Sequence, residues 1–127
     1  MPEKIAIQIG SRLLEAELND TAVAGRIARA LPITAKASTW GDEIYFQIPV
    51  KTALEKGVTE VNKFDLGYWP EGACFCIFFG PTPVSRGEKI IPASAVEIIG
   101  KLAKPDYAEL KKVRSGESIT VRSVENV

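Results

Sequence analysis

The chain has 127 residues, a length that fits one domain with a single hydrophobic core. Its 16 lysines and arginines balance its 16 aspartates and glutamates, so no net charge attracts nucleic acid or an anionic membrane, and we expect neither as a partner. No run of residues approaches the ~20 apolar positions of a membrane-spanning helix, and the first residues do not resemble a secretion signal, so the sequence predicts a soluble, cytoplasmic protein.

The first segments predict a β-hairpin followed by a helix. Apolar residues alternate with polar ones over residues 4–9 and again over residues 12–18, and a Gly-Ser pair between the two runs favours a turn. Residues 19–31 then carry apolar side chains at helical spacing and precede a proline, which stops a helix. Asn19 or Asp20 is expected to cap the start of this helix.

Two further strands are expected in the middle of the chain. Residues 33–40 and residues 43–50 both have strand character, and Gly41 and Asp42 between them suit a tight turn. In the second of these strands, period-two alternation places Glu43, Tyr45 and Gln47 on one face. The opposite face consists of isoleucine and phenylalanine and is expected to face the core.

The second half of the chain predicts three more strands and one helix. Residues 51–71 lack a clear period and are expected as a loop with a turn of helix and a short strand. Residues 73–79 are apolar on both faces, as in a central strand that is covered on both sides. Residues 95–102 and 117–127 are expected as strands, with a short helix at residues 105–113 between them.

This order of elements favours a mostly β architecture. Short strands with two helices and no regular βαβ units predict a closed antiparallel barrel with the helices capping its ends. Closure also removes exposed sheet edges. No linker, repeat or low-complexity tract divides the chain, so we expect a single domain over residues 1–127.

The sequence excludes several kinds of catalytic or metal site. It contains no histidine, which removes nucleophilic catalysis by Ser-His or Cys-His pairs. Cys74 and Cys76 are the only cysteines, and without further ligands they do not make a zinc site. We therefore interpret them as two small buried side chains, and we expect no metal and no cofactor.

Three blocks of sequence resemble a known family. The runs "TWGDEIYFQIPV", "DLGYWPEGACFCIFFGPTP" and "IPASAVEIIGKL", in this order and spacing, resemble the small prokaryotic cyclophilin-like family, which is largely uncharacterised. This resemblance implies a cyclophilin-type barrel of eight strands capped by two helices. It does not imply an established activity.

The resemblance also raises the question of prolyl isomerisation, which is the activity of the true cyclophilins. Their mechanism implies an arginine on the strand after the first helix, and residues 33–50 contain none. The arginines of the chain are Arg12, Arg26, Arg29, Arg86, Arg114 and Arg122. A weak peptidyl-prolyl cis-trans isomerase without the usual arginine is therefore an alternative function, in which Arg86 could supply a donor from the other side.

Aromatic residues and prolines gather at both ends of the apolar run at residues 73–79. They suggest an aromatic-lined groove that binds a small molecule or a proline-containing peptide. The residues expected to line this groove are Trp40, Glu43, Tyr45, Tyr68, Trp69, Phe79 and Thr82.

Other interpretations of these residues stay open. Tyr68 and Trp69 could instead plug a barrel end. A different enzyme could use Glu43 for acid-base chemistry with Tyr45 or Tyr68, provided that the pKa of Glu43 is tuned. A homo-oligomeric scaffold without a ligand is the remaining alternative.

Overall fold

A computed structural model describes residues 3–124 and contains ten strands and two helices in that range. The strands are β1 (Glu3–Ile9), β2 (Arg12–Leu18), β3 (Ile33–Lys36), β4 (Ser38–Thr39), β5 (Glu43–Gln47), β6 (Gly57–Val58), β7 (Asp65–Trp69), β8 (Cys74–Phe78), β9 (Val96–Ala103) and β10 (Ser118–Ser123). The helices are α1 (Ala22–Ala30) and α2 (Tyr107–Lys111). None of the helices in the described range is long and apolar enough to cross a membrane.

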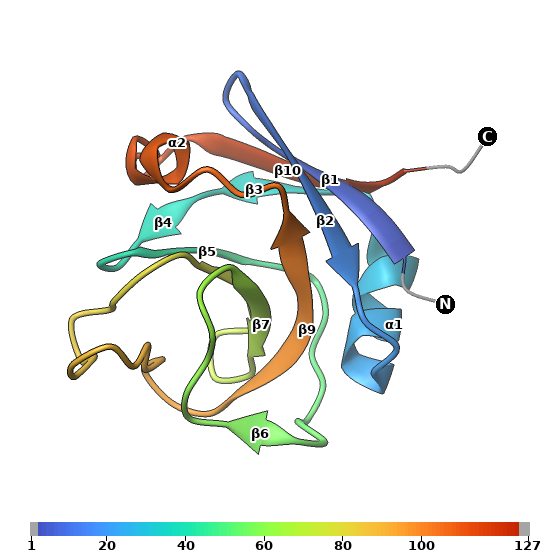
Figure 1. Ribbon diagram of the computed structural model, residues 1–127. Coiled ribbons are helices and arrows are strands. Elements are labelled where there is room, and N and C mark those ends of the chain that lie inside the picture. The colour runs from blue at the N-terminus through green and yellow to red at the C-terminus, as the bar shows by residue number, and fades with distance from the viewer. Residues whose placement is uncertain (1–2, 125–127) are drawn as a thin grey trace.

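All ten strands belong to one antiparallel sheet that curves into a nearly closed barrel (Figure 1). The order is β3-β10-β1-β2-β9-β7-β8-β5-β4, with β6 paired to β9. The two end strands, β3 and β4, are separated in the chain by Ala37 alone, so one kinked segment joins both ends of the sheet. If β3 and β4 are counted as one strand and the two-residue strand β6 is left out, the barrel has the eight strands that the family resemblance implies.

The barrel interior is filled by apolar side chains, which occupy alternating positions along the strands. Ile5, Ile7 and Ile9 of β1 are almost fully buried, as the period-two pattern requires. Phe46 of β5 and Phe75 of β8 stack inside the barrel with ring centroids 5.0 Å apart. These side chains belong to one large cluster, to which residues from nearly all the strands contribute.

The two helices lie on opposite sides of the barrel in Figure 1, and each adds apolar side chains to the core. Helix α1 buries Val23, Ala24 and Ile27, whereas the short helix α2 buries Leu110. The N-cap of α1 is Thr21, whose hydroxyl accepts a hydrogen bond from the amide of Ala24 at 3.2 Å.

The expected cap at Asn19 or Asp20 was wrong by one or two residues. The side chain of Asn19 has another role, because its Nδ2 donates to the carbonyl of Ile98 at 2.8 Å and its Oδ1 accepts from the Thr21 hydroxyl at 2.7 Å. Asn19 therefore joins the start of the helix to β9 and supports the Thr21 cap.

The segment at residues 51–71 was expected to be a loop with a turn of helix and one short strand, and the structure has two strands and no helix there. It contains the two-residue strand β6 and the five-residue strand β7, which pairs with both β8 and β9. Tyr68 and Trp69 are therefore the last two residues of strand β7. The expected strand at residues 117–127 is β10, and residues 125–127 lie outside the described range.

Strand β8 is buried on both of its faces, as the sequence predicts for residues 73–79. Phe75 and Ile77 face the barrel interior. Cys74, Cys76 and Phe78 face outward, where they form a second cluster with Val61, Ile90 and Val96. The segment between β8 and β9 thus covers the outside of the barrel at this point.

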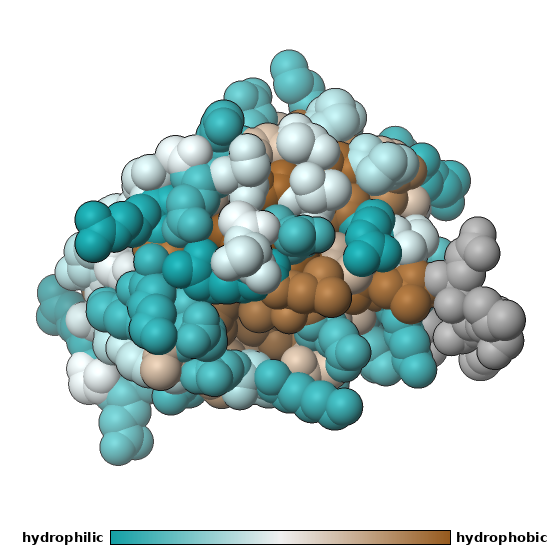
Figure 2. Space-filling view, turned by 90° about the horizontal axis from the view of Figure 1, so that it is seen from above, coloured by the Kyte–Doolittle hydropathy of each residue, from teal (hydrophilic) through white to brown (hydrophobic). Residues whose placement is uncertain are grey.

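Figure 2 shows one face of the molecule, on which hydrophilic side chains surround a smaller hydrophobic area. The exposed large hydrophobic side chains of the described chain are Leu13, Val84, Tyr107 and Val124. Homo-oligomer formation stays a prediction.

Candidate ligand-binding pocket

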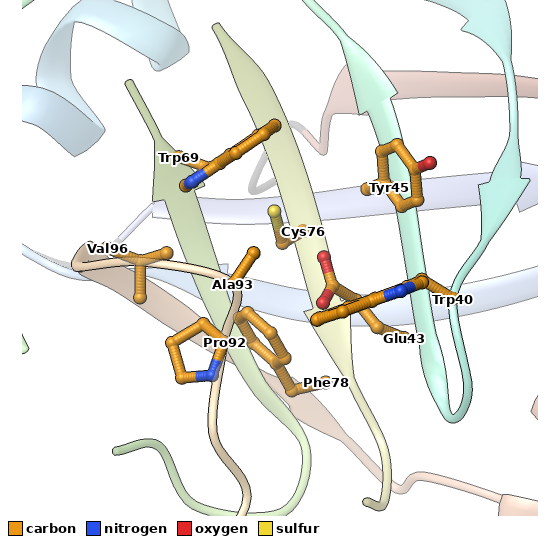
Figure 3. Close-up of a pocket in the computed structure, with 9 residues that line it drawn as sticks. All are labelled: Trp40, Glu43, Tyr45, Trp69, Cys76, Phe78, Pro92, Ala93 and Val96. Carbon is orange, nitrogen blue, oxygen red and sulfur yellow. The ribbon is translucent and has the colours of Figure 1, made fainter. Parts of the chain in front are cut away.

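A pocket of about 210 Å³ lies on the outer surface of the barrel, over strands β5, β7 and β8 (Figure 3). The segment that leads into β9 forms its remaining wall. The pocket is lined by Trp40, Glu43, Tyr45, Trp69, Cys76, Phe78, Pro92, Ala93 and Val96. Most of this lining is apolar or aromatic, with one carboxyl group among it.

Strand register brings the side chains of the pocket floor together. On β5 and β8, Glu43 pairs with Phe78, and Tyr45 pairs with Cys76. Cys76 in turn pairs with Gly67 of β7. A Cβ atom at Gly67 would lie 2.9 Å from the Phe78 ring, so the glycine leaves the room that this ring occupies.

The Trp69 indole forms one side of the pocket, and two contacts fix its position. Its Nε1 donates a hydrogen bond to the Ser94 hydroxyl at 2.6 Å, and this hydroxyl donates to Glu71 at 3.0 Å. A Cβ atom at Gly72 would lie 2.8 Å from the Trp69 ring, so the backbone and the ring are closely packed.

Trp40 forms the opposite side of the pocket from a tight turn between β4 and β5. Trp40 and Glu43 exchange two backbone hydrogen bonds, at 3.0 and 3.2 Å, and Gly41 between them has a φ of +60°. Glycine adopts this left-handed conformation at little cost, as expected for the turn at Gly41 and Asp42. The turn therefore holds both Trp40 and Glu43 at the edge of β5.

Asp42 anchors this turn to the rest of the protein. Its carboxylate accepts hydrogen bonds from the hydroxyl of Tyr107, at 2.6 Å, and from the ammonium group of Lys111, both on α2. Its backbone amide donates to the carbonyl of Pro81 at 2.9 Å. Asp42 is thus a structural carboxylate.

Glu43 is the polar centre of the pocket, and this residue is only 6% exposed. Burial raises the pKa of Glu43 to about 7, while a hydrogen bond with the Cys76 thiol lowers it in part. Figure 3 shows the carboxyl group between the rings of Trp40 and Trp69 and close to the sulfur of Cys76. Within residues 3–124, Glu43 forms no ion pair with a lysine or arginine.

The two cysteines are buried, as the sequence predicts, and they are poor nucleophiles. Burial and the negative charge of Glu43 raise the pKa of Cys76 well above its usual value, and the same causes raise the pKa of Cys74. Because the thiolate is the reactive form, both groups are unreactive near neutral pH. In the described part of the chain, no group of cysteine and acidic side chains could hold a metal ion.

The three buried carboxylates of the described chain differ in their partners. Asp42 has the hydroxyl and ammonium groups of α2. Glu97 accepts hydrogen bonds from the backbone amides of Glu55 and Lys56, at 2.9 and 2.8 Å. Among the described residues, Glu43 has the weak donor of the Cys76 thiol and forms no ion pair, so its burial is less well compensated than that of Asp42 or Glu97.

Four of the seven residues expected at the groove line this one pocket: Trp40, Glu43, Tyr45 and Trp69. The structure does not bring the other three, Tyr68, Phe79 and Thr82, to it. The position of Tyr68 follows from the alternation of side chains along a strand. Tyr68 precedes Trp69 on β7, so it must point to the other face, into the barrel. There its hydroxyl donates to the carbonyl of Val50 at 2.8 Å.

Phe79 and Thr82 have structural contacts elsewhere. Phe79 joins the core and meets the ring of Tyr107 edge-on, with centroids 5.7 Å apart. The hydroxyl of Thr82 donates to the carbonyl of Ile91 and contacts the hydroxyl of Ser85 at 3.0 Å. Thr82 therefore closes the loop after β8.

Five residues of the pocket were not expected from the sequence. Cys76 and Phe78 could have been found, because period two puts both on the outer face of the strand at residues 73–79. Pro92 and Ala93 belong to the segment between β8 and β9, which has no sequence period, and Val96 is the first residue of β9. Arg86, which could have supplied a donor, does not line the pocket, and none of the nine lining residues within the described range is an arginine or lysine.

Comparison with known proteins identifies relatives of this chain. Residues 3–122 match the family model that is described as cyclophilin-like. A hypothetical protein of Archaeoglobus fulgidus, known from a solution structure, is 39% identical and has a TM-score of 0.80, and the match covers 97% of this chain and 95% of that one. No curated protein matches the chain significantly. The chain therefore belongs to the cyclophilin-like family.

Proposed function

We propose that this protein binds a small organic molecule, or one side chain of a peptide, in the pocket around Glu43. The observation that carries this proposal is the burial of the Glu43 carboxyl group at the floor of an aromatic pocket, where its partner is the weak Cys76 thiol and no lysine or arginine of residues 3–124 pairs with it. Burial of a poorly paired polar group destabilises a fold. A ligand that interacts with Glu43 would offset this unfavourable burial.

The size and lining of the pocket indicate what could enter. Its volume of about 210 Å³ lies below the ~300–1,000 Å³ of sites for drug-sized ligands, so one ring or one branched head group would fill it. Its aromatic walls offer apolar contact, and Glu43 offers a single point of polar recognition. Trp69 is held in place by Ser94, so little of its conformational freedom would be lost on binding.

A second candidate is an enzyme that uses Glu43 for proton transfer. The raised pKa of about 7 favours this possibility, because a general acid or base works best near the operating pH. The second group that such chemistry needs is harder to assign. Tyr68 is buried in the barrel core, and Figure 3 shows the Tyr45 hydroxyl turned away from Glu43. Binding is therefore the better supported proposal.

A fragment screen by ¹H–¹⁵N NMR tests the binding proposal. A panel of small aromatic, aliphatic, amide, acidic and basic compounds is added to the labelled protein, and shifts of the indole signals of Trp40 and Trp69 are followed. We expect several compounds to shift both signals and Trp69→Leu to weaken their binding. Ser11→Ala, a change on the exposed β1–β2 turn, serves as the control and should leave binding intact. Binders that perturb only residues outside the pocket would contradict the proposal.

A further inference from the structure

We propose that the ligand of this pocket is an organic cation with a methylated ammonium head group. This inference rests on the proposed function, because it specifies the chemistry of the ligand at the same site. It follows from three properties of the pocket: its aromatic sides, its carboxyl group without a cationic partner among residues 3–124, and its shortage of hydrogen-bond acceptors.

The aromatic sides are suited to a positive charge. In Figure 3 the rings of Trp40 and Trp69 stand on opposite sides of the space that holds the Glu43 carboxyl group, and the Tyr45 ring stands at the rim. A cation over the face of a tryptophan ring is attracted by the ring quadrupole, and tryptophan is the best ring for this contact. Both indoles are half-buried, so each has surface to offer a ligand.

The charge of the pocket also favours a cation. Glu43 is the single charged side chain among the residues that line it within the described range. A neutral ligand would displace water from the Glu43 carboxylate without supplying a counter-charge. An anion and the carboxylate would repel each other. A cation supplies the counter-charge that Asp42 already obtains from Lys111.

The groups that face Glu43 do not supply this counter-charge. Strand β8 contributes the thiols of Cys74 and Cys76, and β5 contributes the phenol of Tyr45. From β7 the lining residue is Trp69, the covering segment contributes Pro92 and Ala93, and β9 contributes Val96, none of which titrates. The charge of the pocket therefore changes with pH mainly through the protonation of Glu43.

The shortage of acceptors distinguishes between kinds of ammonium group. A primary ammonium has three N–H donors, and each needs an acceptor when water is excluded. The pocket lining offers the carboxyl oxygens of Glu43 and few other side-chain acceptors. A quaternary ammonium has no N–H donor and presents only methyl groups, which fit aromatic walls without unsatisfied hydrogen bonds.

The test compares choline with 3,3-dimethylbutan-1-ol, which has the same shape with a neutral carbon in place of the charged nitrogen. Dissociation constants are measured at pH 8 by NMR titration of the Trp40 and Trp69 indole signals. We expect choline to bind at least about tenfold more tightly than the alcohol, given the size of cation–π and charge contributions. Glu43→Gln should remove most of this preference, whereas Glu15→Gln, on the exposed side of β2, should leave it intact.

The pH dependence provides a readout that a merely structural role of Glu43 would not produce. Choline affinity should fall roughly fivefold from pH 7 to pH 6, where Glu43 takes up a proton, and it should change little above pH 8. The alcohol should not lose affinity in this range. The Glu43→Gln variant should show no such dependence for either probe.

The possible results separate the two proposals. Equal binding of choline and the alcohol would overturn the cation inference and leave the proposed binding function standing. No binding of choline would also overturn the inference, while the fragment panel, with its different compounds, would decide the binding function. A choline preference that persists unchanged in Glu43→Gln would contradict the role of the carboxylate.

Discussion

The indole nitrogen of Trp69 donates a hydrogen bond to the hydroxyl of Ser94 at 2.6 Å, and this contact joins strand β7 to the segment that covers the outer face of the barrel. Trp69 forms one side of the pocket, whereas Ser94 lies between the lining residues Ala93 and Val96. The hydrogen bond therefore fixes both the ring and the segment across from the carboxyl group of Glu43.

Ser94→Ala should release the Trp69 ring. The free energy of unfolding should fall by about 1 kcal/mol, the usual contribution of one hydrogen bond. The indole N–H of Trp69 should exchange with solvent faster in the variant, as measured by hydrogen exchange in ¹H–¹⁵N spectra. The indole of Trp40 is the internal control, and its exchange should not change. Unchanged exchange at Trp69 would show that Ser94 does not hold the ring.

Glu43→Gln should make the protein more stable at high pH. Because burial raises the pKa of Glu43 from 4.5 to about 7, the folded state keeps a proton that the unfolded state has already lost between these values. The free energy of unfolding should therefore decrease as pH rises from about 4.5 to about 7. The variant should exceed the wild type at pH 8 by on the order of 3 kcal/mol, and the difference should vanish near pH 4.5. Urea unfolding at pH 4.5, 6 and 8 measures this difference.

Glu97→Gln is the matched control for this experiment. Glu97 is also buried, but its carboxylate accepts two backbone hydrogen bonds from the segment before β6. An amide oxygen accepts such bonds less strongly than a carboxylate, so this variant should be less stable than the wild type by about 1 kcal/mol. A Glu43→Gln variant that is destabilised at pH 8 in the same way would indicate a structural role for Glu43.

The protein should be a poor prolyl isomerase. Loss of one positioned donor from a catalytic site typically lowers the rate by ~10²–10³. The pocket lining within residues 3–124 contains no arginine or lysine, and Arg86 is exposed on the loop after β8. A protease-coupled assay on a proline tetrapeptide should therefore show little acceleration by the wild type or by Arg86→Ala. Efficient turnover that is lost in Arg86→Ala would assign the donor role to Arg86.

Local patterns were sufficient to predict the barrel and part of the pocket. The alternation of apolar and polar residues in β5 predicted that Glu43 and Tyr45 lie on the face away from the core. The turn at Gly41 places Trp40 beside them. The way in which the barrel closes could not be predicted from any single segment. It depends on the kink at Ala37, because β3, before the kink, pairs with β10, and β4, after it, pairs with β5.

The positions of Tyr68 and Thr82 show why the rest of the pocket was not predicted. Tyr68 was grouped with its neighbour Trp69, but strand β7 turns adjacent side chains to opposite faces, and the strand itself was hidden among polar and glycine residues. Thr82 was expected to line the groove, whereas its hydroxyl donates to the carbonyl of Ile91 and closes the loop after β8. Such contacts between residues nine positions apart have no sequence period.

The most direct measurement is the titration of the Glu43 side-chain carboxyl carbon by ¹³C NMR, with and without choline, and with Glu43→Gln to assign the signal. We expect the free protein to titrate near pH 7, because the carboxyl group is buried without a cationic partner. Choline should shift the midpoint to lower pH, because a bound cation favours the ionised form. A midpoint near 4.5 in the free protein, or a midpoint near 7 that no compound of the fragment panel changes, would contradict a ligand site built around Glu43.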